Sequence, residues 1–285
     1  MKVKDFVFVA KPGIVFGNVF AGVGGFFIGS PDSVNRPALF GLITGMTAII
    51  AASCVVNNYL DADIDARMKR TAKRPSVTGA VPVRIGRIYA AALYLAGFSL
   101  LFGLTNLKTA LIGLFGAVMY TVVYGYAKRH TPWATLIGAF PGATPPLAGY
   151  VAATGRFDEA AWLLFVIMFA WQMPHFHAIA IRRFEDYKAA DIPVMPGVHG
   201  LARTVWEMRL FGVAFIVACY LLARWGHAGF MFGLATIAAG LYWLQPMFSP
   251  HWRRDREDIA KVVFKRSLLV LLVLNTFMTL SHVLL

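Results

Sequence analysis

Three side chains that carry oxygen atoms recur at four-residue intervals where an apolar stretch ends: Asn57, Asp61 and Asp65. Residues four apart lie on one face of a helix, so this spacing aligns their oxygens in a single stripe. Carboxylates at that spacing repel each other unless a cation lies between them. Magnesium prefers oxygen ligands, one or two of them carboxylates, and completes its shell with phosphate oxygens and water. The stripe therefore predicts a Mg²⁺ site for a substrate that carries phosphate groups.

Basic residues follow the stripe directly: Arg67, Arg70, Lys73 and Arg74. Such residues bind the oxygens of a diphosphate, and Arg does so with two parallel hydrogen bonds. The alternative is a solvated loop beside a membrane, in which carboxylates offset excess positive charge. Because Asn57 and Asn58 lie at the membrane end of the apolar stretch, where polar groups usually face a cavity, we favour the metal and diphosphate interpretation.

A second charged group follows a later apolar stretch, with Arg182 and Arg183 ahead of Glu185, Asp186 and Asp191. This pattern is weak by itself, because any helix end at a membrane surface can resemble it. Paired with the first group, Asp186 and Asp191 would form a second metal-binding arm, and Arg182 would contact the diphosphate. Two metal ions would neutralise the charge that develops on a departing diphosphate and so assist ionisation of an allylic carbon.

Two further segments could contact substrates. Histidines in an apolar stretch are costly unless partnered, so Trp171, His175 and His177 predict a cavity wall beside a planar acceptor, its metal or its carboxylates. Hydrogen bonds from the histidines to the backbone, where Pro174 should open the helix, are the alternative. Lys128 belongs to a basic segment that is either a membrane anchor or a further diphosphate contact.

The elements that carry these residues are membrane helices. Of the 285 residues, 58% are hydrophobic and only 14% are charged, with a mean hydropathy of +0.63, whereas soluble domains have about 25% charged residues. The apolar runs are long enough to cross about 30 Å of hydrocarbon. We therefore predict an all-α polytopic bundle of nine transmembrane helices around a central cavity, near residues 12–30, 38–58, 86–104, 109–126, 133–151, 160–180, 206–224, 229–248 and 267–285.

The basic residues predict the orientation. If the N-terminus is cytoplasmic, the loops outside hold only Arg36, Lys108, Arg156 and Arg224 of the 27 Lys and Arg residues, as expected when positive charge collects inside. The net charge of +13 is thus a signal of topology, and we expect no nucleic acid partner. One integral-membrane domain, 1–285, would carry its chemistry on cytoplasmic loops at about 59–85 and 181–205, with the C-terminus in the periplasm.

These residues resemble the intramembrane prenyltransferase superfamily over nearly the whole chain. The Asp-rich motifs mark the superfamily, while Pro145-Pro146 and the run from Trp171 to Phe176 resemble its heme-prenylating branch. Other matching elements are Lys11-Pro12-Gly13, Asn18, Asn57-Asn58-Tyr59, Met68, Arg70-Thr71, Arg74, Tyr120-Thr121, Tyr124, Lys128-Arg129-His130 and Asp186 through Val194. In two places the chain departs from the family pattern: Asn58 replaces a common Asp, and Asp186 and Asp191 are five apart rather than four.

The resemblance implies a bacterial inner-membrane enzyme that uses Mg²⁺ and farnesyl diphosphate, with heme b as acceptor. It implies that Asn57, Asp61 and Asp65 hold metal and diphosphate, that Asp186 and Asp191 form the second arm, and that a heme A synthase or an oxidase-assembly protein is a partner. A quinoid or other aromatic acceptor is the second hypothesis. A transporter is the third, although its ionisable residues would more naturally lie at the bilayer midplane.

Overall fold

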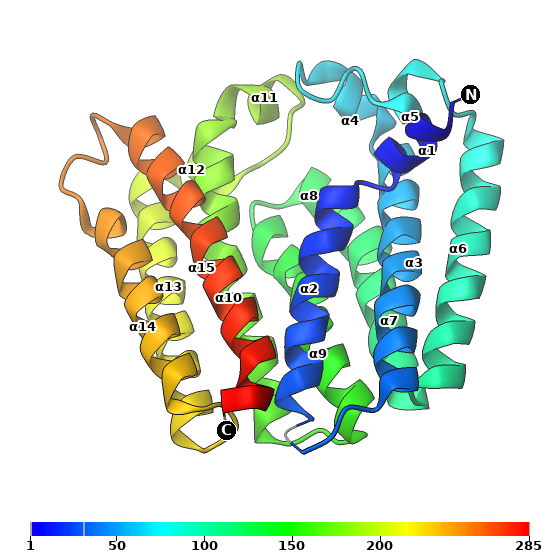
Figure 1. The fold of residues 1–285 in the computed structure, drawn as a ribbon. Helices are drawn as coiled ribbons and strands as arrows, with labels where there is room; N and C mark the ends of the chain where they lie inside the picture. The colour runs from blue at the N-terminus through cyan, green and yellow to red at the C-terminus, as the bar shows by residue number, and fades with distance from the viewer. Residues whose placement is uncertain (1, 31, 285) are drawn as a thin grey trace.

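The computed structural model describes residues 2–30 and 32–284, with side chains described up to Ser281. Every regular element in these ranges is helical. The long elements run alongside one another in a bundle (Figure 1): α2 (Pro12–Ile28), α3 (Arg36–Leu60), α6 (Val83–Leu104), α7 (Leu107–Val118) continued by η1 (Met119–Val123) and α8 (Tyr124–His130), α9 (Ala134–Thr154), α10 (Glu159–Arg182), α13 (Gly200–Arg224), α14 (Phe230–Leu244) continued by η2 (Gln245–Phe248), and α15 (Arg256–Leu284).

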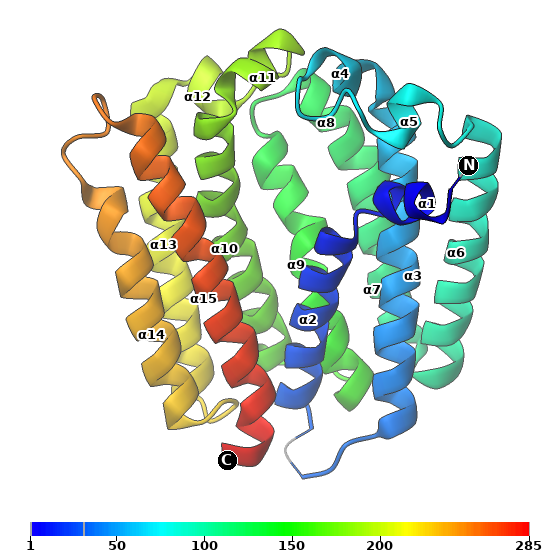
Figure 2. The ribbon, with the colours of Figure 1, turned by 45° about the horizontal axis from the view of Figure 1, so that its top comes forward.

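Short elements gather at one end of the bundle, beside the N-terminus: α1 (Val3–Val9), α4 (Ala62–Arg67), α5 (Pro75–Thr78) and α11 (Phe184–Ala189) (Figures 1 and 2). We call this the loop end. A further short helix, α12 (Met195–Val198), follows α11 along the chain. The C-terminus lies at the opposite end of the bundle (Figure 1). The two ends of the chain therefore lie on opposite sides of the layer that the long helices form.

Seven helices among the described residues are long and apolar enough to cross a membrane, or up to eight if α1 and α2, bent by 56°, count as one span. The predicted all-α membrane bundle is confirmed, but the count of nine is not. The predicted span at 133–151 corresponds to α9, which is long enough but contains Pro141, Pro145 and Pro146 and is not among those seven or eight. Leu285, at the end of the last predicted span, lies outside the described residues.

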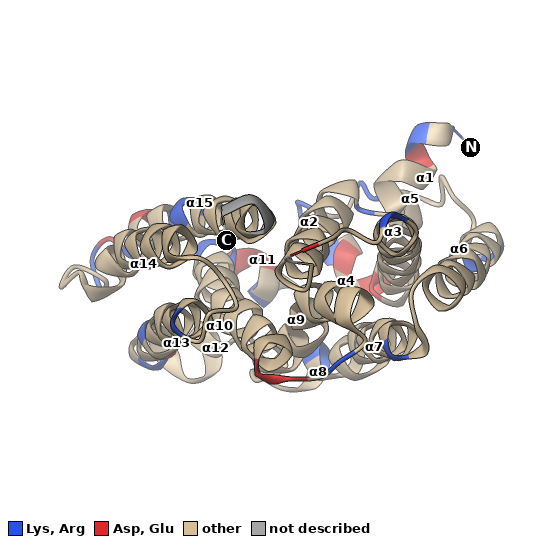
Figure 3. Ribbon diagram, turned by 60° about the horizontal axis from the view of Figure 1, so that its bottom comes forward, with Lys and Arg blue, Asp and Glu red and all other residues tan. Residues whose placement is uncertain are grey.

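The outer surface of the bundle is apolar. Large side chains stand exposed on the long helices, among them Phe16 at 72%, Leu95 at 73% and Phe102 at 63%. Charged residues are sparse along the helices (Figure 3). Burial of such side chains against lipid is favourable in the same way as burial in a core, so this surface is suited to a bilayer.

Asparagine and aspartate side chains cap three of the long helices at their N-termini. Asn35 accepts a hydrogen bond from the backbone N–H of Ala38 at 3.1 Å, and Asn106 accepts one from Thr109 at 2.9 Å. Asp158 does the same for Ala161 at 3.2 Å. Each cap satisfies one of the backbone donors that the first turn leaves free, typically worth about 1 kcal/mol. The caps fix where α3, α7 and α10 begin.

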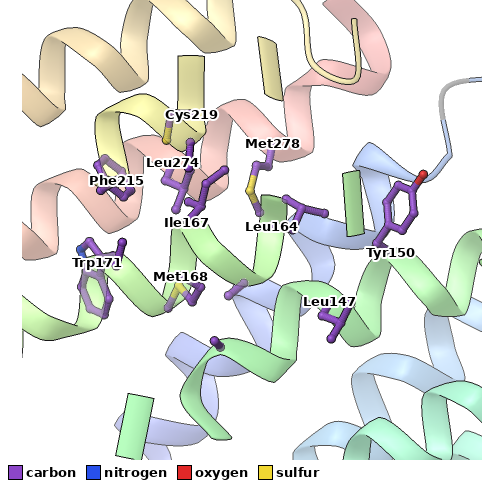
Figure 4. Close-up of a cluster of buried hydrophobic side chains, with 14 of the residues drawn as sticks. Leu147, Tyr150, Leu164, Ile167, Met168, Trp171, Phe215, Cys219, Leu274 and Met278 are labelled. Atoms are coloured by element: carbon purple, nitrogen blue, oxygen red, sulfur yellow. The ribbon is translucent and has the colours of Figure 1, made fainter. Parts of the chain in front are cut away.

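The centre of the bundle is made by α9 and α10 with α2, α13 and α15. Side chains from α9, α10, α13 and α15 interlock there, including Leu147, Met168, Phe215 and Met278 (Figure 4). The backbones of α2 and α9 approach so closely that a Cβ on Gly149 would collide with the carbonyl of Gly22. Glycine is therefore required at this contact, as is common where membrane helices pack without side chains between them.

Proline does not interrupt the helices in the way the sequence predicted. Pro141, Pro145 and Pro146 of α9 predict a kink or an unwound segment, and α9 is not unwound there. The expected opening of α10 at Pro174 is wrong, since this helix also continues through its proline. Pro145 has no N–H to donate to the carbonyl of Pro141. The hydroxyl of Thr144 donates to that carbonyl instead, at 2.7 Å, so the freed backbone acceptor is satisfied within the helix.

Candidate active site

A cavity of about 800 Å³ lies within the bundle and is bordered by α2, α3, α7, α8, α9, α10 and α15. Toward the loop end its wall carries polar and charged side chains, listed here: Lys11, Asn57, Asp61, Asp65, Arg70, Arg74, Lys128, Arg182 and Arg183. Deeper in the bundle the wall is apolar, with Met46, Leu101, Ala148 and Met168. Such a cavity fits a ligand that has an anionic head and an apolar body.

The predicted stripe of oxygens lies at the charged end. Helix α3 ends at Leu60 and α4 begins at Ala62, with Asp61 between them. The junction preserves the helical spacing through backbone hydrogen bonds. The N–H of Asp61 donates to the backbone carbonyl of Asn57 at 3.0 Å, and the N–H of Asp65 donates to the backbone carbonyl of Asp61 at 2.8 Å. Asn57, Asp61 and Asp65 are 3%, 3% and 2% exposed. All three border the cavity.

Each member of the stripe has a basic partner from a different part of the chain. Lys11, between α1 and α2, donates from Nζ to Asn57 Oδ1 at 2.8 Å. Lys128 of α8 pairs with Asp61. Arg74, just before α5, pairs with Asp65. Positive charge from three segments therefore converges on one row of oxygens.

The stripe is chemically suited to Mg²⁺. Asp61 Oδ1 and Asn57 Nδ2 are buried with no hydrogen-bond partner among the described residues, and a buried carboxylate oxygen without a partner is suited to bind a cation. Hard oxygen donors on an amide and two carboxylates match the preference of this ion. In the described ranges no group of three or more His, Cys, Asp or Glu side chains is arranged to hold a metal ion. Phosphate oxygens and water would have to supply the rest of the shell.

The second predicted arm lies outside the cavity wall. Neither Asp186 nor Asp191 borders the cavity, and Asp191 is 83% exposed at its side chain, with its carboxylate 2.9 Å from Nη1 of Arg67. Arg67 and Lys73 do not border the cavity either. The structure thus groups Arg70, Arg74, Lys128 and Arg182 with the stripe, and it leaves Arg67, Lys73, Asp186 and Asp191 outside.

The two charged loops nevertheless touch each other above the cavity. Ile64 and Met68 of the first loop pack with Ala190 of the second, and Tyr187 lies against this small cluster. Burial raises the pKa of the Tyr187 phenol, so it stays protonated at neutral pH. The contact places the start of the second arm directly beside the stripe.

Arg129, next to Lys128 in the chain, has a structural role. Its guanidinium donates to both oxygens of Asp63, at 2.6 and 2.7 Å, and to the carbonyl of Leu60 at 2.5 Å. These hydrogen bonds hold the pKa of the Asp63 carboxyl at about 2. Arg129 is thus committed to the α3–α4 junction, and Lys128 alone of the two borders the cavity.

Trp171 and His175 form an aromatic wall on the α10 side of the cavity. Their rings stack at 4.7 Å, and Phe264 of α15 lies 5.1 Å from the imidazole. The hydroxyl of Ser267 donates to the Phe264 carbonyl at 2.6 Å, so its oxygen accepts from Nδ1 of His175 at 2.7 Å. This assignment of hydrogen bonds leaves a lone pair on Nε2 of His175, an atom without a protein partner in the described part of the chain.

His177 lies on a different side of α10. It is fully buried, its Nε2 is 3.0 Å from Glu207 of α13, and Glu207 also accepts from Arg203 at 2.9 Å. His177 does not border the cavity. The structure therefore brings Trp171 and His175 to the cavity and places His177 between helices.

Sequence reasoning did not assign a site role to Lys11, Tyr120 or Tyr124, although all three border the cavity. The hydroxyl of Tyr120 donates to Asn57 at 3.3 Å, and its ring stacks on that of Tyr124 at 5.7 Å. Tyr120 lies within η1, a π-helical turn, and such turns frequently occur at functional sites. The signal in the sequence was the unusual depth of these polar residues at the ends of apolar runs.

The fold and the site together define a polytopic membrane protein with a cavity that carries carboxylate and basic side chains at one end. A model of the UbiA prenyltransferase family matches residues 18–269, and the chain belongs to this family. It is 39% identical to the protoheme IX farnesyltransferase of Citrobacter koseri, over 98% of this chain and 95% of that protein. It is 41% identical to protoheme IX farnesyltransferase 2 of Chromobacterium violaceum, over 98% and 93%.

Solved structures share the fold at low sequence identity. Digeranylgeranylglyceryl phosphate synthase matches with a TM-score of 0.81 at 16% identity, covering 99% of both chains. A UbiA homologue from Archaeoglobus fulgidus bound to DMAPP and Mg²⁺ matches with a TM-score of 0.67 at 16% identity, over 94% of this chain and 99% of that one. The same homologue also matches in a structure bound to GPP and Mg²⁺, with a TM-score of 0.67.

Proposed function

We propose that the protein transfers the farnesyl group of farnesyl diphosphate to a vinyl group of heme b, giving heme O and pyrophosphate. Similarity over almost the full length to protoheme IX farnesyltransferases, at about 40% identity, carries the identity of both substrates. The cavity supports it, because its charged end and apolar depth suit a diphosphate joined to an isoprenoid chain.

The diphosphate would bind at the charged end. Asn57, Asp61 and Asp65 would hold Mg²⁺, and Arg70, Arg74, Lys128 and Arg182 would bind the diphosphate oxygens. The metal, when bound, supplies positive charge that stabilises the leaving group. The basic side chains add charge-assisted hydrogen bonds to the same oxygens. Asp186 and Asp191, with Arg67 and Lys73, remain proposed contacts of the second arm.

The reaction begins as the bond between the farnesyl C1 and the diphosphate oxygen breaks, with its electron pair leaving on the diphosphate. The allylic carbon then forms a bond to the terminal carbon of the heme vinyl group. Water adds to the other vinyl carbon and loses a proton, which completes the hydroxyethylfarnesyl group. The apolar wall formed by Met46, Leu101 and Met168 would hold the farnesyl chain and keep bulk water from the allylic carbon.

The acceptor would lie against the aromatic wall. Trp171 and His175 offer flat surfaces for a porphyrin, and Nε2 of His175 offers a lone pair. A nitrogen lone pair can bind the heme iron, whereas a heme carboxylate would need a hydrogen-bond donor at that position. We therefore propose that the heme iron, and not a heme carboxylate, lies beside His175. His177, committed to Glu207, is not part of this proposal.

The whole chain would form one integral-membrane domain in the bacterial inner membrane. The loop end would face the cytoplasm, with the N-terminus there and the C-terminus in the periplasm, as the distribution of Lys and Arg predicts. Loops 59–85 and 181–205 would then close over the substrate from the cytoplasmic side. A heme A synthase or an oxidase-assembly protein would receive the product.

The decisive experiment supplies the purified protein, in detergent or nanodiscs, with heme b, farnesyl diphosphate and Mg²⁺. Mass spectrometry should detect a heme that is heavier by one farnesyl group plus one water, and chelation of Mg²⁺ should abolish it. Absence of that product from protein that binds both substrates would refute the proposal. Prenylation of an added quinoid acceptor in place of heme would instead support the second hypothesis.

A further inference from the structure

Lys11 is a cation at the charged end of the cavity that has no acidic partner. Its Nζ bonds only to the neutral amide oxygen of Asn57, at 2.8 Å, and no carboxylate in the described residues lies within ion-pair distance of it. Lys128 and Arg74, in contrast, each pair with an aspartate. Lys11 is partly buried and borders the cavity, and a partly buried charge without a countercharge is disfavoured, so its position favours an anion that joins it during function.

The backbone at Lys11 is held in an unfavourable conformation. Its φ of 53° and ψ of 65° lie in the left-handed region. Among the described residues other than glycine, only Asp191 also has a positive φ. Lys11 also precedes Pro12, which restricts it further. Strain of this kind persists where surrounding structure enforces it, and it occurs most often at functional sites. Here it marks the 56° bend between α1 and α2, which directs the lysine to the cavity.

The location of Lys11 identifies the anion. Asn57 is one turn of helix from Asp61, so Lys11 borders the proposed metal and diphosphate site. The heme side of the cavity is formed by α10 and α15, through Trp171, His175 and Phe264. The proposed diphosphate is therefore the anion that lies on the same side of the cavity as Lys11.

Lys11 and a metal ion compete for the same atom. The amide of Asn57 has a single oxygen, and Lys11 already binds it. A divalent cation on that oxygen would repel an ammonium group at hydrogen-bond distance. Lys11 must therefore leave Asn57 when the metal binds, and the diphosphate that arrives with the metal offers it a new acceptor.

We propose that Lys11 is a diphosphate-binding residue that holds Asn57 while the site is empty and moves to a diphosphate oxygen when Mg²⁺ takes Asn57. The inference rests on the proposed diphosphate site and adds an exchange of partners to it. One consequence is cooperative binding. When Mg²⁺ binds alone, Lys11 loses its hydrogen bond to Asn57 and gains no new acceptor. When Mg²⁺ and diphosphate bind together, the metal takes the Asn57 oxygen and Lys11 gains a diphosphate oxygen.

The test compares Lys11→Met with Lys4→Met, a control that removes an exposed charge from the neighbouring α1. Calorimetry on purified protein measures Mg²⁺ alone and a non-hydrolysable farnesyl thiodiphosphate with and without Mg²⁺, and absorption spectroscopy measures heme b. Lys11→Met should weaken Mg²⁺-dependent binding of the analogue about tenfold or more, the loss expected for one charge-assisted hydrogen bond. Mg²⁺ alone should bind this variant at least as tightly as the wild type. Lys4→Met should change neither affinity.

Each alternative outcome is distinguishable. If wild-type protein binds the analogue and Lys11→Met binds it equally well, the role of Lys11 is refuted while the proposed function stands. If Lys11→Met loses affinity for heme b rather than for the analogue, the anion is a heme carboxylate and the inference is wrong. If the wild type does not bind the analogue with Mg²⁺ at all, the proposed function itself fails. Lys11→Arg, which keeps the charge, should retain more affinity than Lys11→Met, and it replaces that variant if Met prevents folding.

Discussion

The pair between Lys128 and Asp61 allows the structural and catalytic roles of one aspartate to be separated. The side chains are 12% and 4% exposed, so each charge depends on the other. Removing one partner of a buried ion pair costs about 3–5 kcal/mol, because the remaining charge is left buried. Lys128 borders a cavity that admits water, which favours the lower end of this range. We expect Asp61→Asn to lower the free energy of unfolding by about 3 kcal/mol and to abolish turnover.

A second change should restore stability without restoring activity. In the Asp61→Asn background, Lys128→Met removes the unpaired charge but keeps an apolar side chain of similar length. The double variant should therefore regain most of the lost free energy of unfolding. It should remain inactive, because an amide cannot replace a carboxylate as a charged metal ligand and Lys128 no longer binds the diphosphate. Lys128→Met alone should cost less than Asp61→Asn, since Arg129 lies 3.9 Å from Asp61 and still offsets its charge.

Tryptophan fluorescence during titration with sodium dodecyl sulfate would measure unfolding of the four proteins in mild detergent. The two positions should show a coupling of at least about 1 kcal/mol, as expected for residues in contact. Strictly additive losses would show that the pair does not stabilise the fold. Turnover by the double variant would show that Asp61 acts only as a counterion to Lys128, and the assignment of Asp61 to the metal would be wrong.

Three further predictions test the helix contact, the aromatic wall and the contact between the loops. Gly149→Ala should lower the free energy of unfolding by about 1–3 kcal/mol through overpacking. Gly103→Ala is the control, because a Cβ there would enter open space, and it should not lower stability. If Gly149→Ala is as stable as the wild type in thermal melts, the α2–α9 contact is contradicted. Ser267→Ala should weaken heme b binding about tenfold or more in absorption titrations, because His175 loses the acceptor that fixes its tautomer, and an unchanged affinity and spectrum would remove the histidine from the acceptor site. Asp191→Asn should change the free energy of unfolding by less than about 1 kcal/mol, as for other exposed ion pairs, and a larger loss in chemical unfolding would show that the loop contact stabilises the fold.

The alignment of the three oxygen-bearing side chains could be predicted from the sequence because its signal is local. Asn57, Asp61 and Asp65 follow helical spacing, and that spacing survives the junction between α3 and α4 through backbone hydrogen bonds. Lys11 is a different case. Its contact with Asn57 joins positions 46 residues apart and depends on a left-handed backbone angle that no periodicity reveals. The expected opening of α10 at Pro174 was wrong. Helix α9 stays helical through its prolines, where Thr144 satisfies the acceptor that Pro145 frees, and this depends on side-chain geometry.

Helical phase explains why only one of the two histidines reaches the cavity. His175 and His177 are two residues apart, so they point about 200° from each other around α10. Once Trp171, four residues before His175, faces the cavity, His177 must face a neighbouring helix. The structure provides Glu207 there. The sequence alone could have made this choice between the histidines, but the partner on α13 could not be foreseen from it.

The position of the second arm is consistent with a site that closes when it is loaded. Asp191 is attached to the first loop only through Arg67, in a pair whose side chains are 83% and 47% exposed, and such pairs contribute at most about 1 kcal/mol. The apolar contact beneath it involves Ile64, Met68 and Ala190. Release of Arg67 from Asp191 would therefore cost little and would free an arginine and a carboxylate together, one suited to the diphosphate and the other to a metal. The two loops already touch above the cavity, so the proposed second arm predicts that the Arg67–Asp191 pair breaks when Mg²⁺ and diphosphate bind.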